Sequence, residues 1–254
     1  MKFIHLSDLH YHTHQGDNAQ IIETLKYVKD NYPGHKLIVT GDIADDGKEE
    51  QFAAALQGLS PFKGRIFICP GNHDFGAAGN FYSQERAERF DRMLAVELTQ
   101  GGTFKGDNTP VVNIVKDDSA EVMLIALDTN LETEHPFDFA CGEVGEEQLA
   151  ALKTILSNPA SASMKKILFF HHHPFIHNNP FMEMRDARNL FRAVYNRVDV
   201  VLFGHKHVSS RWTNMNGISY VLAADDSPGK NFAREIEITG ANISVKDIPI
   251  KAGV

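Results

Sequence analysis

The chain has 254 residues, which is enough to bury a large core and close to the upper limit for a single one, so we expect one domain over residues 1–254. Apolar residues make up 43% and charged residues 23%, which is typical of a folded globular protein and excludes a disordered chain. The formal net charge of -8 argues against long nucleic acid as the main partner, because proteins that bind it usually present a basic surface.

The first part of the chain alternates apolar runs with amphipathic segments. The runs 2–7, 36–40 and 65–69 are typical of short buried strands. Between them, 18–31 and 48–58 carry apolar residues at helical spacing. This βαβαβ order predicts a sheet covered by helices.

The rest of the chain has the same mixed character, and its last part alternates apolar and polar residues in short runs typical of antiparallel strands. No stretch resembles a signal peptide or reaches membrane length, so we expect a cytoplasmic protein without a membrane partner. The sequence does not indicate the oligomeric state.

After the first three strands, the predicted elements in chain order are a helix at 80–97, a hairpin of strands 111–115 and 122–127, a helix at 146–156, a strand at 166–170, a helix at 186–197, a strand at 199–203 and the strands after 210.

Metal-binding types of side chain follow the ends of five predicted strands. Because the carboxyl ends of strands form the ligand crevice of open α/β sheets, we expect these side chains to meet at one rim. Asp and His together suit Zn, Mn or Fe, and so many ligands exceed the four of a structural zinc site. The clusters are Asp8-Leu9-His10, Gly41-Asp42, Gly71-Asn72-His73-Asp74, His171-His172-His173 and Gly204-His205-Lys206-His207.

The spacing within two of these clusters suggests how each binds. In Asp8-x-His10 and His205-x-His207, side chains two positions apart lie on the same side of an extended backbone, so both can reach one ion or one pair of ions. Two ions that share a carboxylate would use all the ligands and leave room for water. Asp45 and Asp46 are expected to cap the helix that follows them rather than to bind metal.

These motifs, from Asp8-x-His10 to Gly204-His205-x-His207, resemble the calcineurin-like metallophosphoesterase superfamily. The similarity covers residues 1 to about 210 and, in the size of the chain, is closest to small bacterial cyclic-nucleotide and glycerophosphodiester phosphodiesterases. It implies a four-layer αββα sandwich, formed by two mixed β-sheets flanked by helices, with the site at one edge. It also implies two transition-metal ions, which we expect to be Mn, Fe or Zn.

The resemblance further implies a role for each residue of the site. Asp42 would bridge the two ions, and Asn72 would bind through its amide oxygen. Members of the superfamily usually place one histidine ligand two residues before a proline, and this selects His172 over His171 and His173. The implied ligands are Asp8, His10, Asp42 and His207 for one ion, and Asp42, Asn72, His172 and His205 for the other.

The expected reaction is hydrolysis of a small phosphate ester, in which a hydroxide that bridges the metals attacks phosphorus. His73 stays off the metals, stabilises developing charge and can protonate the leaving oxygen, so Asp42 and His73 are the predicted catalytic residues. His177 and Arg185, on the loop after the histidine cluster, are candidate substrate contacts together with His73.

Three alternatives to a phosphodiesterase remain open. The arginine that protein phosphatases of this superfamily carry after Gly-Asp is missing from the segment 41–47, which favours small diesters over monoesters. A phosphomonoesterase remains possible if Arg185, Arg188 or Lys206 supplies a clamp for a dianion. A DNA-processing nuclease and an inactive interaction scaffold are the other two alternatives.

Overall fold

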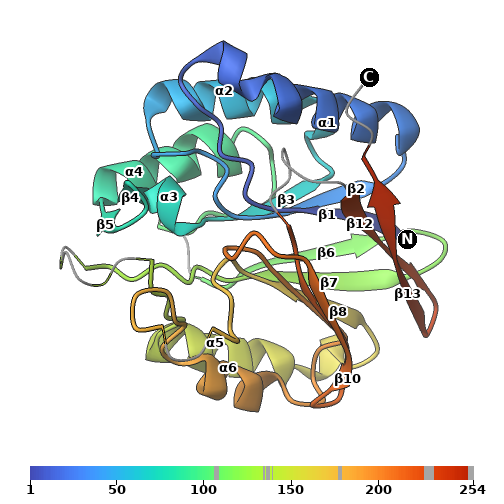
Figure 1. The fold of residues 1–254 in the computed structure, drawn as a ribbon. Coiled ribbons are helices and arrows are strands. Elements are labelled where there is room, and N and C mark those ends of the chain that lie inside the picture. Colours follow the sequence, from blue (N-terminus) through green and yellow to red (C-terminus); the bar gives the residue numbers. More distant parts are fainter. Residues whose placement is uncertain are drawn as a thin grey trace.

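Two β-sheets pack face to face, and helices cover the outer face of each (Figure 1). The computed structural model describes residues 1–105, 109–133, 135, 138, 140–176, 179–225 and 232–250. Both sheets contain parallel and antiparallel neighbours, so the predicted αββα sandwich of two mixed sheets is confirmed.

The first sheet has the strand order β13-β12-β1-β2-β3. The three strands predicted in the first part of the chain are parallel neighbours in it, and the last two strands of the chain extend it in antiparallel pairing. Helices α1 and α2 cover its outer face (Figure 1). The bounds are β1 Lys2–Leu6, β2 Lys36–Thr40, β3 Ile66–Cys69, β12 Phe232–Thr239, β13 Asn242–Pro249, α1 Ala19–Asn31 and α2 Glu49–Leu59.

The second sheet has the order β10-β11-β9-β8-β7-β6, and α5 and α6 cover its outer face (Figure 1). Its central strands β7, β8 and β9 are parallel, and β6 forms the predicted hairpin with β7. The bounds are β6 Val111–Lys116, β7 Glu121–Ala126, β8 Lys165–Phe169, β9 Val200–Phe203, β10 Ser210–Met215, β11 Ile218–Ala223, α5 Glu146–Leu156 and α6 Ala187–Val194.

The side chains of the second sheet alternate between two cores. On β8, Ile167 and Phe169 point toward the first sheet and join the core between the sheets. Leu168 and the following Phe170 point the other way and pack in the core under α5 and α6. This alternation continues past the end of the strand and decides which of the next residues face the first sheet.

Two predicted elements differ from the structure. The tail is not purely antiparallel, because β11 pairs in parallel with β9 before β12 and β13 return to the first sheet. The predicted helix 80–97 is shorter, since it begins at α4, Gln84–Phe90, and continues as a π-helix over Asp91–Ala95. Within the described residues, no helix has the length and apolar character needed to span a membrane.

Candidate metal centre

The carboxyl ends of β1, β2, β3, β8 and β9 lie at one edge of the sandwich, as predicted, and the metal-binding types of side chain gather there. The structure brings six of the seven predicted metal ligands together, and the seventh place is taken by a different histidine. The gathered residues are Asp8, His10, Asp42, Asn72, His171, His205 and His207.

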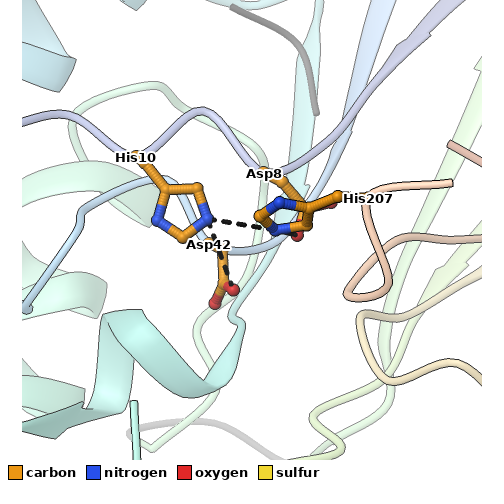
Figure 2. A group of neighbouring side chains, drawn as sticks. All are labelled: Asp8, His10, Asp42 and His207. Atoms are coloured by element: carbon orange, nitrogen blue, oxygen red, sulfur yellow. Dashed lines mark hydrogen bonds and ion pairs between the residues drawn. The ribbon is translucent and has the colours of Figure 1, made fainter. Parts of the chain in front are cut away.

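The first group of side chains consists of Asp8, His10, Asp42 and His207, and one candidate ligand atom from each lies within 4.8 Å of those of the others. His207 Nε2 lies 3.1 Å from Asp8 Oδ1. Figure 2 shows the His10 ring directed toward Asp42 and His207, with its Nε2 3.9 Å from Asp42 Oδ2 and 3.4 Å from His207 Nε2. The four side chains enclose one position for a cation.

The second group also contains Asp42, together with Asn72, His171 and His205. His171 Nε2 is at its centre and lies 3.1 Å from each of three atoms, namely Asp42 Oδ2, Asn72 Oδ1 and His205 Nδ1. Asp42 Oδ2 therefore faces both groups. One carboxylate oxygen thus lies at the boundary between the two groups of candidate ligands.

Hydrogen bonds outside the second group fix which atoms face inward. His171 Nδ1 lies 2.8 Å from the carbonyl oxygen of Thr40, which can only accept, so Nδ1 carries the proton and Nε2 is the nitrogen directed into the group. Asn72 Nδ2 donates to the carbonyl oxygen of Gly79 at 2.8 Å, which leaves Oδ1 directed inward. Each contact is typical of the outer hydrogen bonds that orient metal ligands.

The structure places His171, rather than the expected His172, beside Asp42 in the second group. His171 continues the alternation of Ile167 and Phe169, so its side chain faces the first sheet, where Asp42 lies. His172 follows the alternation of Phe170, which packs in the core under α5 and α6. His172 is buried, and its Nδ1 lies 2.8 Å from Thr129 Oγ1 instead. The strand alternation, and not the distance to the proline, decides which ring reaches the site.

The backbone at these residues is not extended, which corrects the reason given for the paired spacing. Asp8, His10, Asp42, His205 and His207 all have positive φ, from 48° to 74°. This left-handed region is costly for residues other than glycine, and such strain gathers at functional sites where the surrounding structure holds it. Tight turns, and not strand alternation, bring each pair of side chains to the same centre.

The charges of the site favour a bound cation. Asp8 and Asp42 are 0% and 2% exposed, and among the described residues their ion pairs are with histidines rather than with Lys or Arg. Burial favours a neutral Asp42, but nearby histidines, His171 first, hold its pKa well below the ordinary value. Although burial favours the neutral ring, Asp42 raises the pKa of His171 to about 9. Buried carboxylates need a positive partner, so the donors fit transition-metal ions.

Asp74 has a role that the sequence analysis missed. Its buried carboxylate accepts backbone N–H groups from Ile43 at 3.2 Å, Ala44 at 2.8 Å and Gly71 at 2.9 Å. The carboxylate thereby links the turn after β2, which carries Asp42, to the turn after β3, which carries the candidate ligand at position 72. The sequence signal for this role was the position of the acid directly after Gly-Asn-His. A buried carboxylate beside two tight turns can accept hydrogen bonds from their backbone N–H groups.

Asp45 does not cap α2, contrary to the sequence-based prediction. Its carboxylate lies 3.4 Å from His10 Nδ1 and 3.3 Å from His12 Nδ1, and its carbonyl oxygen is 2.7 Å from His73 Nδ1. Asp46 accepts from the backbone N–H of Ala78 at 2.8 Å and does not cap α2 either. The helix has Lys48 at its N-cap position. Asp45 thus orients both a candidate ligand and the candidate catalytic histidine.

Not all of the predicted substrate contacts lie within the described residues. Arg185 lies on the segment before α6 and forms an ion pair with Asp138, so its charge is already partnered. His177 lies outside the described residues. Arg188 and Lys206 are exposed. Within the described part of the chain, no Arg or Lys side chain forms an ion pair with the carboxylates of the candidate metal ligands.

The fold and the two groups of candidate ligands fit a metallophosphoesterase, and the model of the calcineurin-like phosphoesterase family matches residues 1–209. The chain belongs to this family, as the motifs predicted. Most of the chain, including all the residues of the two groups, lies within the match.

Curated relatives are distant. The chain is 23% identical over 207 residues to the 3',5'-cyclic adenosine monophosphate phosphodiesterase CpdA of Haemophilus influenzae, covering 78% of this chain and 64% of that protein. It is 24% identical to a probable cyclic nucleotide phosphodiesterase of Coxiella burnetii, covering 82% and 76% of the two chains. It is 26% identical to the probable glycerophosphodiester phosphodiesterase GpdQ of Arcobacter nitrofigilis, covering 75% and 63%.

Solved structures share the fold at low sequence identity. A dimetal phosphatase from Danio rerio superposes with a TM-score of 0.71 at 13% identity, covering 99% of this chain and 96% of that one. A purple acid phosphatase from yellow lupin gives a TM-score of 0.66 at 12% identity, covering 100% of this chain and 52% of that one. These similarities agree with the sandwich architecture.

Proposed function

We propose that this protein is a dinuclear metal-dependent phosphodiesterase that hydrolyses small phosphate esters. Asp8, His10, Asp42 and His207 would hold one ion. Asp42, Asn72, His171 and His205 would hold the other. The observation that carries this proposal is Asp42 Oδ2, which faces His10 Nε2 of the first group at 3.9 Å and His171 Nε2 of the second at 3.1 Å.

Two ions in these positions would lower the pKa of a coordinated water and neutralise charge on phosphoryl oxygens. The donor set, with several imidazoles beside carboxylates, suits Mn, Fe or Zn better than Ca or Mg. The chain's own contribution is to bury the two carboxylates, to fix the inward atoms of His171 and Asn72, and, among the described residues, to keep Lys and Arg side chains out of ion pairs with those carboxylates.

We assign to His73 the transfer of a proton to the leaving group. Its backbone N–H donates to Asp42 Oδ1 at 2.9 Å, which ties it to the shared carboxylate, and its Nδ1 faces the carbonyl oxygen of Asp45. The ring therefore exchanges protons through Nε2. A Cβ at Gly79 would lie 2.6 Å from that nitrogen, so glycine at this position leaves Nε2 uncovered. These features suit a general acid for the departing oxygen.

We expect small phosphodiesters to be hydrolysed at least as well as phosphomonoesters. A monoester at neutral pH approaches two negative charges and gains from arginine clamps, whereas a diester carries one. Among the described residues, Arg185 is paired with Asp138 rather than with a group of the candidate metal centre. The test is kcat/KM for bis-p-nitrophenyl phosphate and for p-nitrophenyl phosphate with the same metal. A monoester preference of about tenfold, or about 1.4 kcal/mol, would contradict this expectation.

A further inference from the structure

The candidate metal centre is assembled from both sheets, so its geometry depends on how the sheets are held together at this edge. Asp8 follows β1 of the first sheet, whereas His205 and His207 follow β9 of the second. The backbone N–H of His205 lies 3.1 Å and 3.2 Å from the two carboxylate oxygens of Asp8. A Cβ at Gly204 would lie 1.9 Å from Ser7 Oγ, so the loop after β9 packs tightly against the first sheet.

Arg234 continues this junction beyond His207. It lies on β12 of the first sheet, opposite His5 of β1, and is 4% exposed. Its Nη2 donates to Ser209 Oγ at 2.6 Å, and its Nη1 donates to the carbonyl oxygen of Ala223 at 2.7 Å. Ser209 is two residues after His207, and Ala223 ends β11 of the second sheet. One side chain of the first sheet therefore holds both the loop after β9 and the end of β11.

A buried guanidinium is a costly way to join two sheets. Its carboxylate partner is Asp247 of β13, which lies 3.2 Å from Nε and is 46% exposed. Removing a guanidinium from water costs free energy, and a well-packed apolar side chain often stabilises a core as well or better. An apolar side chain cannot supply a planar fork of donors directed at two fixed acceptors. The contacts of Arg234 therefore indicate a role in the geometry of the loop.

We infer that Arg234 is a positioning residue for the first ligand group, and that it acts through Ser209 to hold the loop of His207 against Asp8. The inference rests on the proposed function, which assigns His207 and Asp8 to the same ion. His207 Nε2 lies 3.1 Å from Asp8 Oδ1, but the His207 side chain is 38% exposed, so packing covers only part of the ring. Since a metal site needs its ligands within roughly 0.5 Å of the productive geometry, the loop backbone has to be fixed.

The second ligand group has supports of its own. His171 Nδ1 is held by the carbonyl oxygen of Thr40, and His205 is held by the bonds from its own backbone N–H to Asp8. Loss of the contact between Arg234 and Ser209 should therefore weaken the binding of one ion and spare the other. A general loosening of the fold would weaken both.

The test measures the affinity of the metal-free protein for Zn²⁺ by competition with a chelating dye. Arg234→Met keeps an apolar stem and leaves no charge in the core, and it should raise Kd for the first ion about 10- to 100-fold. Ser209→Ala, which removes one hydrogen bond, should raise it about tenfold. Kd for the second ion should stay within about twofold in both variants. Arg211→Ala is the matched control, because Arg211 lies 3.3 Å from the same Asp247 but is exposed on β10, and both Kd values should be unchanged.

His207→Ala identifies which ion is affected. This variant should lose the first ion and keep the second. Adding Arg234→Met to His207→Ala should leave the affinity for the remaining ion unchanged, because Arg234 acts on the same ion as His207. Circular dichroism and thermal unfolding of the metal-free proteins would show whether each variant folds.

The outcomes separate this inference from the proposed function. Unchanged affinity for both ions in Arg234→Met, weaker binding of both, or a further loss in the double variant would overturn the positioning role. If Arg234→Met does not fold, Ser209→Ala decides, because it keeps the guanidinium, and unchanged affinity for the first ion in that variant would overturn the inference. A wild type that binds no transition-metal ion would instead refute the proposed function.

Discussion

Asp42→Asn should abolish binding of both metal ions and lower kcat/KM for a phosphodiester by about 10⁴-fold or more. Asp42 Oδ2 faces both ligand groups, so the substitution removes one negative charge from each ion at once. A 10⁴-fold loss corresponds to about 5.5 kcal/mol of transition-state stabilisation. Metal content by elemental analysis and steady-state kinetics on the same preparation would measure both effects.

His73→Ala is the matched control for this substitution. His73 lies next to the shared carboxylate but belongs to neither ligand group, so both metals should remain bound while activity falls by about 10² to 10³-fold, the usual effect of losing a general acid. Loss of both metals from His73→Ala would show that this residue is misassigned. Retention of both metals by Asp42→Asn would show that the carboxylate does not bridge.

The second large effect concerns the histidine triplet. His171→Ala should lose one ion of the two and about 10³-fold in kcat/KM, since His171 Nε2 is the atom on which the second group converges. His172→Ala should keep both ions, because that ring contacts Thr129 and has no carboxylate partner among the described residues. Both rings are buried, so circular dichroism and thermal unfolding of the two variants would serve as the folding control.

The pattern of metal loss decides between the two histidines. One ion lost from His172→Ala, with two retained by His171→Ala, would restore the assignment made from the spacing to Pro174. Equal metal loss from both variants would indicate that the loop collapses as a whole, and would contradict the specific role given to His171.

The strands of the αββα sandwich and the edge that carries the site were predictable from the sequence. Apolar runs end in Asp8, Asp42 and Asn72, and parallel strands present their carboxyl ends to the same edge. Local sequence patterns carry this information because each strand and its terminal turn are adjacent in the chain. The pairing of β11 with β9 was not predictable in this way, since it depends on which sheet has a free edge.

The differences between the expected and the observed site have a similar cause. His171 faces Asp42 because it continues the alternation of Ile167 and Phe169. Which side of the strand these two residues occupy depends on how the second sheet packs against the first, and this packing is a tertiary feature. The contact of Asp45 with His10 likewise joins residues 35 positions apart, and it depends on the turn after β2 rather than on helix-capping preference. Local propensity favoured a cap at Asp45, and tertiary structure placed a ligand-orienting carboxylate there.

The most direct test of the central claim is the number of transition-metal ions that each chain binds. The purified protein is loaded with Mn, Fe or Zn, exchanged into metal-free buffer and subjected to elemental analysis together with a protein assay. The two groups that share Asp42 predict two ions per chain, with both lost from Asp42→Asn. A single tightly bound ion under every loading condition would contradict the dinuclear centre.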